Sequence, residues 1–446
     1  MSFDSGMELA PGRRESVRTA PPEMISERLD ILLVSSMPPS PPRFGAQARV
    51  HGLFTELARR HDVTAVVLHD EEFDRAECER AMRAWCREVV LLPNPGGRDG
   101  RTKRLMQLRS LASLDSYERH RHAVPGLQAA LDRVTSARRF DVVNLEFPFL
   151  AHYRLRGSPP GTPEPALVLD AHDIAYRITR QVAEGETGLV RRVYAALNWR
   201  KLRREELAAF RAADAVAVCS ELDRARLLED LPGVRAEVIP NAADVERFRP
   251  RAGDPRPDGR TVLYFGLLAT APNIDGLRFF VREIWPRVLA RRPGARFRIV
   301  GARPPPAVKE LAGGSVDLAG FVEDLRPELA AAAAVVVPLR LGSGTRLKIV
   351  EALAMGKGVV STRLGAEGLA TEHDRHILLA DEPERFADQV VRLLEDPATA
   401  ERLGEEGRRL AVERYAWSSA ARALEALYRQ VISAREQAAA PARRAS

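Results

Sequence analysis

Short apolar runs alternate with longer amphipathic segments along most of this chain. The first apolar run covers residues 29–34, and it is followed by a Pro-rich loop, a helical pattern at residues 46–60 and a second apolar run at residues 63–68. Continuous runs of leucine and β-branched residues are typical of strands buried on both faces of a parallel sheet. The pattern therefore predicts strand–helix–strand units, with ligand-binding loops at the carboxyl ends of the strands.

The same alternation continues to about residue 240. A long helical region is predicted at residues 180–210, and Ser220 has the position of an N-cap residue before the next helix. Further short strands are predicted at residues 89–92, 141–145, 166–169, 215–219 and 238–239.

A segment without periodicity then divides the chain. Residues 249–260 are charged and rich in Pro and Gly, which predicts a linker. The alternation restarts with a strand at residues 261–265, a loop and a helix at residues 273–291. We therefore expect two doubly wound α/β domains, residues 29–248 and 261–415, that face each other across a cleft.

The two ends of the chain differ in character. Residues 1–28 lack the apolar segment of a secretory signal, and we expect a disordered tail there. Residues 416–436 predict an amphipathic helix, because apolar side chains recur in it at helical spacing. The Ala- and Arg-rich residues 437–446 are expected to fray.

The stretch at residues 335–362 carries the densest functional signal. It predicts a buried strand, a glycine turn that includes Ser343, Gly344 and Thr345, and a helix that starts at Arg346. The first turn of such a helix presents free backbone N–H groups and the positive end of the helix dipole. With Arg346 and Lys348 beside it, this helix start is a candidate anion site.

Helical spacing places Lys348 and Glu351 together, opposite the apolar face of the same helix. There they offer a cation for a phosphate and a carboxylate for a hydroxyl. The alternative interpretation is a solvated ion pair on an ordinary amphipathic helix. The stretch is not a Walker loop, since Gly356-Lys357 is followed by Gly358 instead of Ser or Thr.

Two further positions follow predicted strands of the first domain. His172 lies between Asp170 and Asp173 at the carboxyl end of the strand at residues 166–169, where it is placed for a site or for a surface loop. Gly45 ends the first Pro-rich loop, where the absence of a side chain would let a ligand approach the backbone, although a plain turn glycine explains it equally.

Composition narrows the class of protein. Among 446 residues, 45% are hydrophobic and 29% charged, which is typical of soluble globular proteins, and there is no run of eighteen apolar residues. Three scattered cysteines neither form a disulfide framework nor make a zinc cluster, so we expect a reducing cytoplasm.

The net charge of +7 is unevenly placed. Residues 98–139 hold ten Lys or Arg against four acids, and residues 191–204 hold six with no acid. Such segments are compatible with an anionic membrane, a phosphorylated acceptor or a solvated helix face. Nucleic acid is not expected as a partner, because aromatic residues are sparse there and no nucleic-acid motif accompanies the charge.

Three segments together resemble a known family. They are Val238-Ile239-Pro240-Asn241, Phe265-Gly266 through Asn273 to Gly276, and Gly342-Ser343-Gly344-Thr345-Arg346-Leu347-Lys348 through Glu351. In this order and spacing they resemble the retaining, nucleotide-sugar-dependent glycosyltransferases of the GT-B fold, family 4 (group 1) in particular. The resemblance covers about residues 29–431.

The resemblance implies two Rossmann-like domains, with the acceptor on the first, the donor on the second and the last helix crossing back to the first. It implies retaining transfer from a UDP- or GDP-sugar to a glycan, a lipid-linked sugar or a small molecule, as in polysaccharide biosynthesis. The nucleotide-sugar is a co-substrate, and no cofactor or metal is expected. Location would be cytoplasmic, with peripheral contact at the inner face of an anionic membrane as a weaker hypothesis.

The resemblance also implies roles for individual residues. Glu351 would hold the ribose hydroxyls of the donor, Arg346 and Lys348 would neutralise its diphosphate, and His172 would lie near the sugar and the acceptor. The implied catalytic residues are thus His172, Arg346 and Lys348. The implied donor-binding residues are Gly45, Gly266, Asn273, Ser343, Gly344, Thr345, Arg346, Lys348 and Glu351.

Two departures from the family pattern leave alternatives open. Ser343 occupies the position of a glutamate that normally contacts the transferred sugar, and Gly266 is followed by Leu267 instead of a basic residue. A nucleotide-sugar 2-epimerase of similar two-domain form, or a non-catalytic sugar-binding protein, would share the other features.

Overall fold

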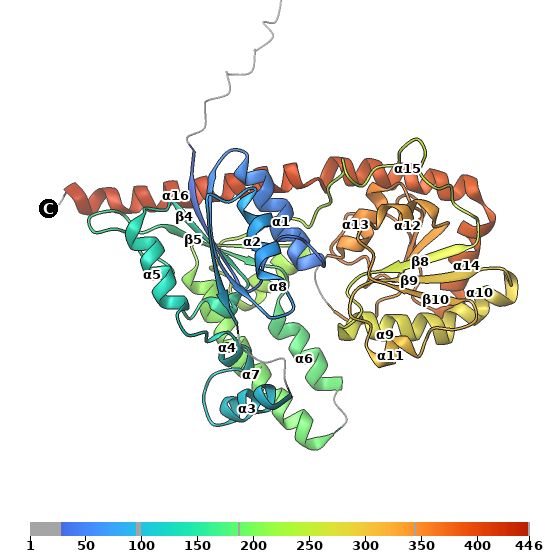
Figure 1. Cartoon of the computed structure of the whole chain (residues 1–446), viewed down its shortest axis with the longest axis horizontal. Helices are drawn as coiled ribbons and strands as arrows, with labels where there is room; N and C mark the ends of the chain where they lie inside the picture. Colours follow the sequence, from blue (N-terminus) through green and yellow to red (C-terminus); the bar gives the residue numbers. More distant parts are fainter. Residues whose placement is uncertain (1–27, 95–99, 186–187, 343–344, 445–446) are drawn as a thin grey trace, which may run out of the picture.

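Two parallel sheets organise the chain (Figure 1). The computed structural model describes residues 28–94, 100–185, 188–342 and 345–444, so the predicted N-terminal tail lies outside the described residues up to position 27. Both sheets are flanked by helices on both faces, and the last two helices of the chain follow one another along one side of the two domains. This architecture confirms the predicted fold class.

The N-terminal sheet has seven strands in the order β3-β2-β1-β4-β5-β6-β7. Its strands are β1 (Asp30–Ser35), β2 (Asp62–His69), β3 (Glu88–Pro93), β4 (Val142–Glu146), β5 (Ala166–Ala171), β6 (Ala215–Val218) and β7 (Ala236–Val238). The helices of this domain are α1 (Gly45–Ala58), α2 (Arg75–Arg83), α3 (Gly100–Leu111), α4 (Tyr117–His122), α5 (Leu127–Ala137), the 3₁₀ turn η1 (Pro148–Leu150), α6 (Ala175–Gly185), α7 (Leu189–Ala212) and α8 (Glu221–Asp230).

The C-terminal sheet has six strands in the order β10-β9-β8-β11-β12-β13. Its strands are β8 (Thr261–Phe265), β9 (Arg296–Val300), β10 (Val316–Gly320), β11 (Ala334–Val337), β12 (Val359–Ser361) and β13 (Leu378–Leu379). The helices are α9 (Ala271–Phe279), the π-helical stretch η2 (Phe280–Ile284), α10 (Trp285–Arg291), α11 (Pro306–Lys309), α12 (Arg326–Ala331), α13 (Leu347–Ala354), α14 (Pro383–Glu395) and α15 (Pro397–Arg414).

The order of the strands in each sheet determines where a binding site can form. In each sheet the order reverses beside the first strand of the domain, next to β1 and next to β8, and the loops after the strands at such a point diverge to leave a crevice. Successive residues of β1 serve opposite faces, since Ile31 and Leu33 pack with α1 whereas Leu32 and Val34 pack with α5 and α7. The continuous apolar runs of the sequence therefore reflect burial on both faces.

The final helix, α16 (Trp417–Arg444), starts at the C-terminal domain and packs on the first, as predicted (Figure 1). Its apolar side chains, from Trp417 to Val431, join the core formed by α1 and β1. The helix extends past the predicted end at Glu436 to Arg444, and the added segment is mostly Ala and Arg, which are good helix formers, with one proline, Pro441.

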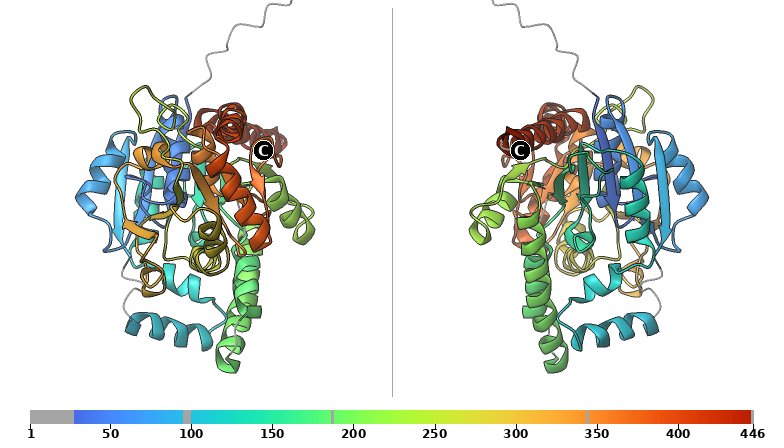
Figure 2. Two further views of the ribbon diagram at one scale, coloured as in Figure 1. Left: turned by 90° about the vertical axis from the view of Figure 1, so that its right-hand side faces the viewer. Right: turned by 90° about the vertical axis from the view of Figure 1, so that its left-hand side faces the viewer.

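One predicted helix is two helices. The region predicted as one helix at residues 180–210 belongs to α6, which ends at Gly185, and α7, which begins after Gly188. Glycine disfavours the helix interior by about 1 kcal/mol, and two glycines close together end one helix before the next begins. With α3, these helices form a projection at the lower end of the domain in Figures 1 and 2.

None of the helices in the described ranges combines the length and apolarity needed to cross a bilayer.

We predict that Gly52→Ala will destabilise the packing of α16. A Cβ atom at Gly52 would lie 2.3 Å from carbon atoms of the Trp417 ring, so the helix or the ring must move. Alanine gains about 1 kcal/mol of helix propensity, but overpacking costs about 1–3 kcal/mol, and we expect a net loss in the free energy of unfolding.

Urea denaturation measures this loss. Gly233→Ala is the control, because nothing lies within 4 Å of a Cβ atom built there. A variant of Gly52 as stable as the parent would contradict the close packing of Trp417 against α1.

Candidate active site

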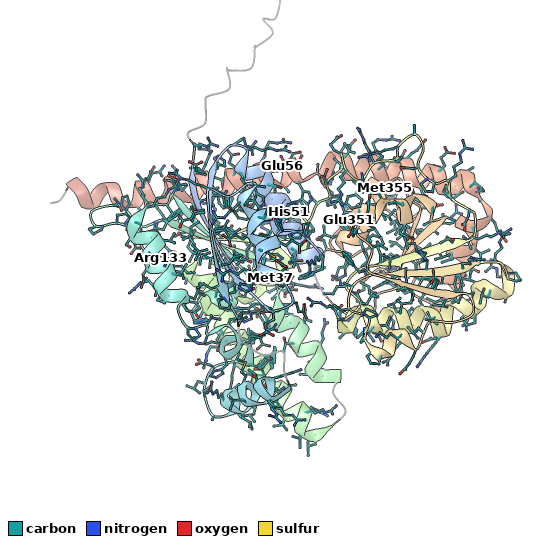
Figure 3. The ribbon with its side chains drawn as sticks, viewed as in Figure 1. Met37, His51, Glu56, Arg133, Glu351 and Met355 are labelled. Atoms are coloured by element: carbon teal, nitrogen blue, oxygen red, sulfur yellow. The ribbon has the colours of Figure 1, made fainter. Side chains whose placement is uncertain are left out.

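A cavity of about 1030 Å³ lies between the two domains. Its walls come from the α1 start and the β4 and β5 loops of the first domain, from residues 241–248 after β7, and from the β8 and β11 loops of the second. His51 of α1 and Glu351 of α13, both labelled in Figure 3, line this cavity from the first and the second domain. The carboxyl ends of both sheets therefore open into one space.

The β11–α13 unit forms the wall of the second domain. Gly342 has a φ of 105°, a conformation that side-chain-bearing residues rarely adopt, and it lets the chain turn away from the strand. Arg346 is the extended N-cap residue of α13, and Ile349, Val350 and Leu353 are buried beneath the helix. The opposite face of α13 is thereby turned to the cavity.

Lys348 is held at the back of this wall. Its Nζ atom donates to Tyr264 Oη at 2.9 Å and to Asn273 Oδ1 at 3.1 Å, and it lies 4.1 Å from the centroid of the Tyr264 ring. Burial, and after it the charge of Arg346, lower the pKa of Lys348 from 10.5 to about 7, while the charge of Glu351 opposes this shift. An anion placed here would raise that pKa and hold the ammonium charged.

The β8 loop completes the surroundings of the ammonium group. Gly266 has a φ of 144°, and a Cβ atom there would lie 3.1 Å from Lys348 Nζ. Asn273 accepts from Tyr264 Oη at 2.7 Å and donates through Nδ2 to the Leu267 carbonyl oxygen at 2.6 Å. Gly266 and Asn273 thus leave room for Lys348 and orient it.

Arg346 adds a second cation to the cavity. Burial lowers its pKa from the ordinary value, and the charges of Glu367, Asp173 and Asp223 oppose that shift. Two cations within one turn of a helix start, where free N–H groups also point outward, favour a doubly charged anion such as a diphosphate.

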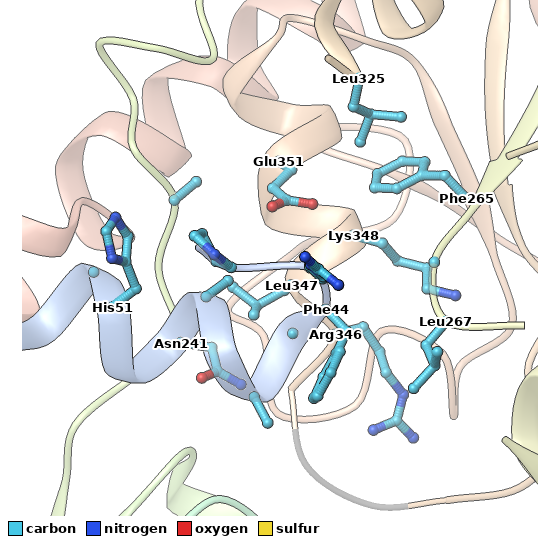
Figure 4. Close-up of a pocket in the computed structure, with 18 of the residues that line it drawn as sticks. Phe44, His51, Asn241, Phe265, Leu267, Leu325, Arg346, Leu347, Lys348 and Glu351 are labelled. Atoms are coloured by element: carbon cyan, nitrogen blue, oxygen red, sulfur yellow. The ribbon is translucent and has the colours of Figure 1, made fainter. Parts of the chain in front are cut away.

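Glu351 presents its carboxylate to the same cavity (Figure 4). Within the described part of the chain this carboxylate makes no hydrogen bond and no ion pair. Burial raises the pKa of Glu351 from 4.5 to about 7, against the charges of Arg247 and Lys348. A half-buried carboxylate of this kind is stabilised when a ligand supplies hydroxyl donors.

His172 faces the cavity from the first domain. Its Nε2 atom lies 2.6 Å from Glu146 Oε2, and its ring stacks on Phe147 at 4.0 Å between centroids. Phe147 has a φ of 64°, and such backbone strain, which costs on the order of 1–3 kcal/mol, is typical of functional sites. Burial and the charge of Asp170 raise the pKa of Glu146, and the hydrogen bond from His172 opposes this.

A chain of buried hydrogen bonds joins His172 to α16. Tyr428 Oη donates to Asn144 Oδ1 at 2.8 Å, and Asn144 Nδ2 donates to Glu146 Oε1 at 2.7 Å. Glu146 in turn bonds the imidazole. The crossing helix therefore helps to fix the orientation of His172.

Arg49 and Asp170 form a buried ion pair beneath the cavity. Their side chains are 1% and 0% exposed, and Arg49 Nη2 and Nε donate to the two carboxylate oxygens at 2.9 and 3.0 Å. Arg49 Nη1 also donates to Asn241 Oδ1 at 3.0 Å, and Asn241 Nδ2 donates to the Thr345 carbonyl oxygen at 3.1 Å. This network connects α1 to Thr345, just before α13.

One group of side chains in the described residues has the spacing of metal ligands. Ligand atoms of Glu146, Asp170 and His172 lie within 4.8 Å of one another. Arg49 already occupies both oxygens of Asp170, and His172 bonds Glu146. The guanidinium of Arg49 balances the charge of Asp170, and His172 and Asn144 bond the two oxygens of Glu146, so hydrogen bonds within the protein account for the arrangement.

The cavity gathers the residues singled out in the sequence. Ser343 and Gly344 lie outside the described residues. The others all line the cavity: Gly45, His172, Gly266, Asn273, Thr345, Arg346, Lys348 and Glu351. Their catalytic and donor-binding roles stay predictions.

Several side chains that hold the predicted site residues were not themselves predicted. Arg49, Glu146, Phe147 and Tyr264 hold or orient the predicted residues, and none belongs to a motif. One signal was available in the sequence, because Arg49 interrupts the apolar face of the helix at residues 46–60. A charged side chain on a buried face requires a partner.

Two facing parallel-sheet domains with a cavity between them, and a last helix that returns to the first domain, define the GT-B class of glycosyltransferase folds. Sucrose-phosphate synthase from Thermosynechococcus elongatus superposes with a TM-score of 0.67 at 18% identity, over 91% of this chain and 100% of its own. HepE from Anabaena, solved with UDP and glucose, superposes with a TM-score of 0.61 at 17% identity, over 90% and 99%. At these identities the likeness concerns the fold.

Sequence comparison gives the family. The model of glycosyltransferase family 4 matches residues 45–247, and the model of the group 1 glycosyl transferases matches residues 259–396. The two matches cover one domain each, and the chain therefore belongs to the group 1 glycosyltransferases of family 4.

A curated relative, the MMP alpha-(1->4)-mannosyltransferase of Mycolicibacterium hassiacum, is 38% identical over 115 residues, which is 25% of this chain and 28% of its own. The chain spans between a quarter and about a third of the lengths of the curated relatives it matches.

We predict that Arg49→Met will lower the free energy of unfolding by about 3–5 kcal/mol, because it leaves the buried carboxylate of Asp170 without its partner. Combining it with Asp170→Asn removes the unpaired charge and should recover part of the loss. Urea denaturation of both variants measures this. Equal stability of the single and double variants would show that the charge of Asp170 is not the cause.

A second prediction concerns pH. Because the pKa of Glu351 is raised to about 7, the folded protein holds a proton that the unfolded chain releases above about pH 4.5. Ionisation of Glu351 therefore lowers stability as pH rises through this window. Glu351→Gln should gain about 1–2 kcal/mol over the parent between about pH 4.5 and 7, after allowance for solvent screening.

Thermal unfolding of both proteins across this pH range gives the comparison. The matched control is Glu413→Gln, a change at an exposed glutamate of α15. A gain that is independent of pH would contradict a raised pKa at Glu351.

Proposed function

We propose that this glycosyltransferase moves a sugar from a nucleoside-diphosphate donor, a UDP- or GDP-sugar, to a glycan, lipid-linked or small-molecule acceptor, with retention at the anomeric carbon. The observation that carries the proposal is that one face of a helix presents two side chains to the cavity, a lysine and a carboxylate that has no hydrogen-bond partner among the described residues. Glu351 fits a ribose diol, and Lys348 fits the diphosphate next to it.

The proposed donor is attracted to the cavity by the positive charges of Arg346 and Lys348. A nucleoside diphosphate brings negative charge beside Arg346, Lys348 and the first turn of α13, and it raises the pKa values that burial has lowered there. HepE has been solved in complex with UDP and glucose and in complex with UDP-glucose, which supports a nucleotide-sugar donor here.

In the proposed reaction the bond from the anomeric carbon to the diphosphate oxygen breaks, and a bond to the acceptor oxygen forms on the same face. The acceptor proton passes to the departing diphosphate oxygen. Arg346 and Lys348 stabilise the charge that develops on the leaving group, which is where a preorganised cation lowers the barrier most. We assign His172, which lines the cavity and is held by Glu146 and Phe147, to the sugar and the acceptor.

In the proposed reaction Arg346 and Lys348, instead of a metal ion, stabilise the leaving group, and no cofactor is required. A cytoplasmic location, with peripheral contact at the inner face of an anionic membrane, belongs to the proposal as well, and the two basic segments at residues 98–139 and 191–204 support that contact.

We predict that Lys348→Ala and Glu351→Ala will each lower turnover about ten- to a thousandfold, as expected for a lost charge-assisted contact of roughly 1.5–3 kcal/mol or more. The measurement is nucleoside-diphosphate release from UDP-, GDP-, ADP- and dTDP-sugars, with and without candidate acceptors. Release that depends on the acceptor supports transfer, whereas equal release without it favours an epimerase-type elimination.

The matched controls are Lys309→Ala and Glu413→Ala, which change exposed residues of α11 and α15 outside the cavity. Parental rates in both cavity variants would show that the donor does not bind at α13.

A further inference from the structure

Most of the exposed large apolar side chains gather on one projection of the N-terminal domain. Three of the eleven in the described residues, Phe321, Leu341 and Val412, are scattered over the C-terminal domain. The other eight lie on α3, on the turn after it and on the first turns of α7: Leu105, Leu108, Leu111, Leu114, Leu189, Val190, Val193 and Leu197. A concentration of this kind marks an interaction site.

This α3–α7 surface, residues 100–114 and 188–200, is also strongly basic. Its exposed charged residues are all cations: Arg101, Lys103, Arg104, Arg109, Arg191, Arg192 and Arg200. Neither segment contains an Asp or a Glu. Leucine and valine interspersed with arginine and lysine are the composition of surfaces that lie in the interface of an anionic bilayer.

Polar contacts hold the two segments together. Lys201 Nζ donates to the Ser113 carbonyl oxygen at 2.8 Å, and Ser110 Oγ lies 3.3 Å from Tyr194 Oη. These contacts join α3 to α7 without using the exposed leucines and valines, which stay available to a partner.

The surface lies at the lower end of the molecule in Figure 1 and in both views of Figure 2, far from α16. It is nevertheless attached to the acceptor side of the cavity. α6, which leads to α7, begins at Ala175 just after His172, and Ile178 of α6 lines the cavity.

We propose that the α3–α7 surface docks on an anionic membrane, with its apolar side chains among the lipid headgroups and its cations against the negative charges. A second copy of the chain is a poorer occupant, because two such faces would bring seven cations against seven. The α3–α7 surface gives a place to the membrane contact that the proposed function includes. Presentation of a lipid-linked acceptor to the cavity would follow from docking, and this inference rests on the proposed function.

The experiment is co-sedimentation of the full chain with vesicles of phosphatidylglycerol and phosphatidylcholine, or of phosphatidylcholine alone. One variant reverses two cations, Arg191→Glu with Arg192→Glu, and another places charge on the apolar positions, Leu108→Asp with Leu189→Asp. The matched controls on the C-terminal domain, all at exposed positions, are Arg282→Glu with Arg385→Glu, and Val412→Asp.

We expect the parent to sediment with the anionic vesicles and not with phosphatidylcholine alone. Loss of each cation should weaken binding roughly fivefold, so the double reversal should cost at least about twenty-five-fold. The apolar variant should also lose at least about tenfold, and the controls should stay within about twofold of the parent. Parental thermal unfolding shows that each variant is folded.

Three results would overturn the proposal. They are absence of vesicle binding by the parent, equal binding to both vesicle types, and a parent dimer that the apolar variant dissociates, which would assign the surface to a second copy. The measurement contains no sugar donor. A failure of the proposed transfer would therefore leave vesicle binding unchanged, and the two failures are distinguishable.

Discussion

The buried ion pair of Arg49 and Asp170 is the interaction on which the site depends. It lies at the carboxyl end of β5, and without its partner either charge would be too costly to bury. Because Arg49 also bonds Asn241, which bonds the Thr345 carbonyl, the same guanidinium links helix α1 to the loop before α13. The ion pair of Arg49 and Asp170 thus lies beneath the cavity and joins elements of both domains that line it.

The second domain holds a cation and an anion, Lys348 and Glu351, whose charged forms its own residues stabilise poorly. Burial brings the pKa values of both Lys348 and Glu351 to about 7, so the charged forms of both side chains are poorly stabilised there. A diphosphate next to one and a diol next to the other would correct both. The proposed donor would gain binding energy by stabilising these two charged side chains. Their burial costs the protein stability, as is common at functional sites.

Much of this protein was accessible from its sequence, because parallel sheets buried on both faces require continuous apolar strands and the interposed helices require their own period. These local rules predicted the two domains, the linker and an amphipathic last helix, whereas the return of that helix to the first domain was implied by the family resemblance. The glycine loop before Arg346 was equally accessible, since a strand–glycine–helix unit has few alternative geometries. The break at Gly185 and Gly188 was missed because a single glycine is tolerated inside many helices.

The sequence by itself therefore determined the strands, the helices and the residues at loop ends, which follow from local backbone and burial preferences. Only the tertiary structure decided which of them meet. Tyr264 orients Lys348, and Glu146 and Phe147 hold His172, through contacts between positions far apart in the chain or through strained backbone that no periodicity encodes. Long-range partners are set by how the strands order and the helices pack, and a linear pattern does not contain that order.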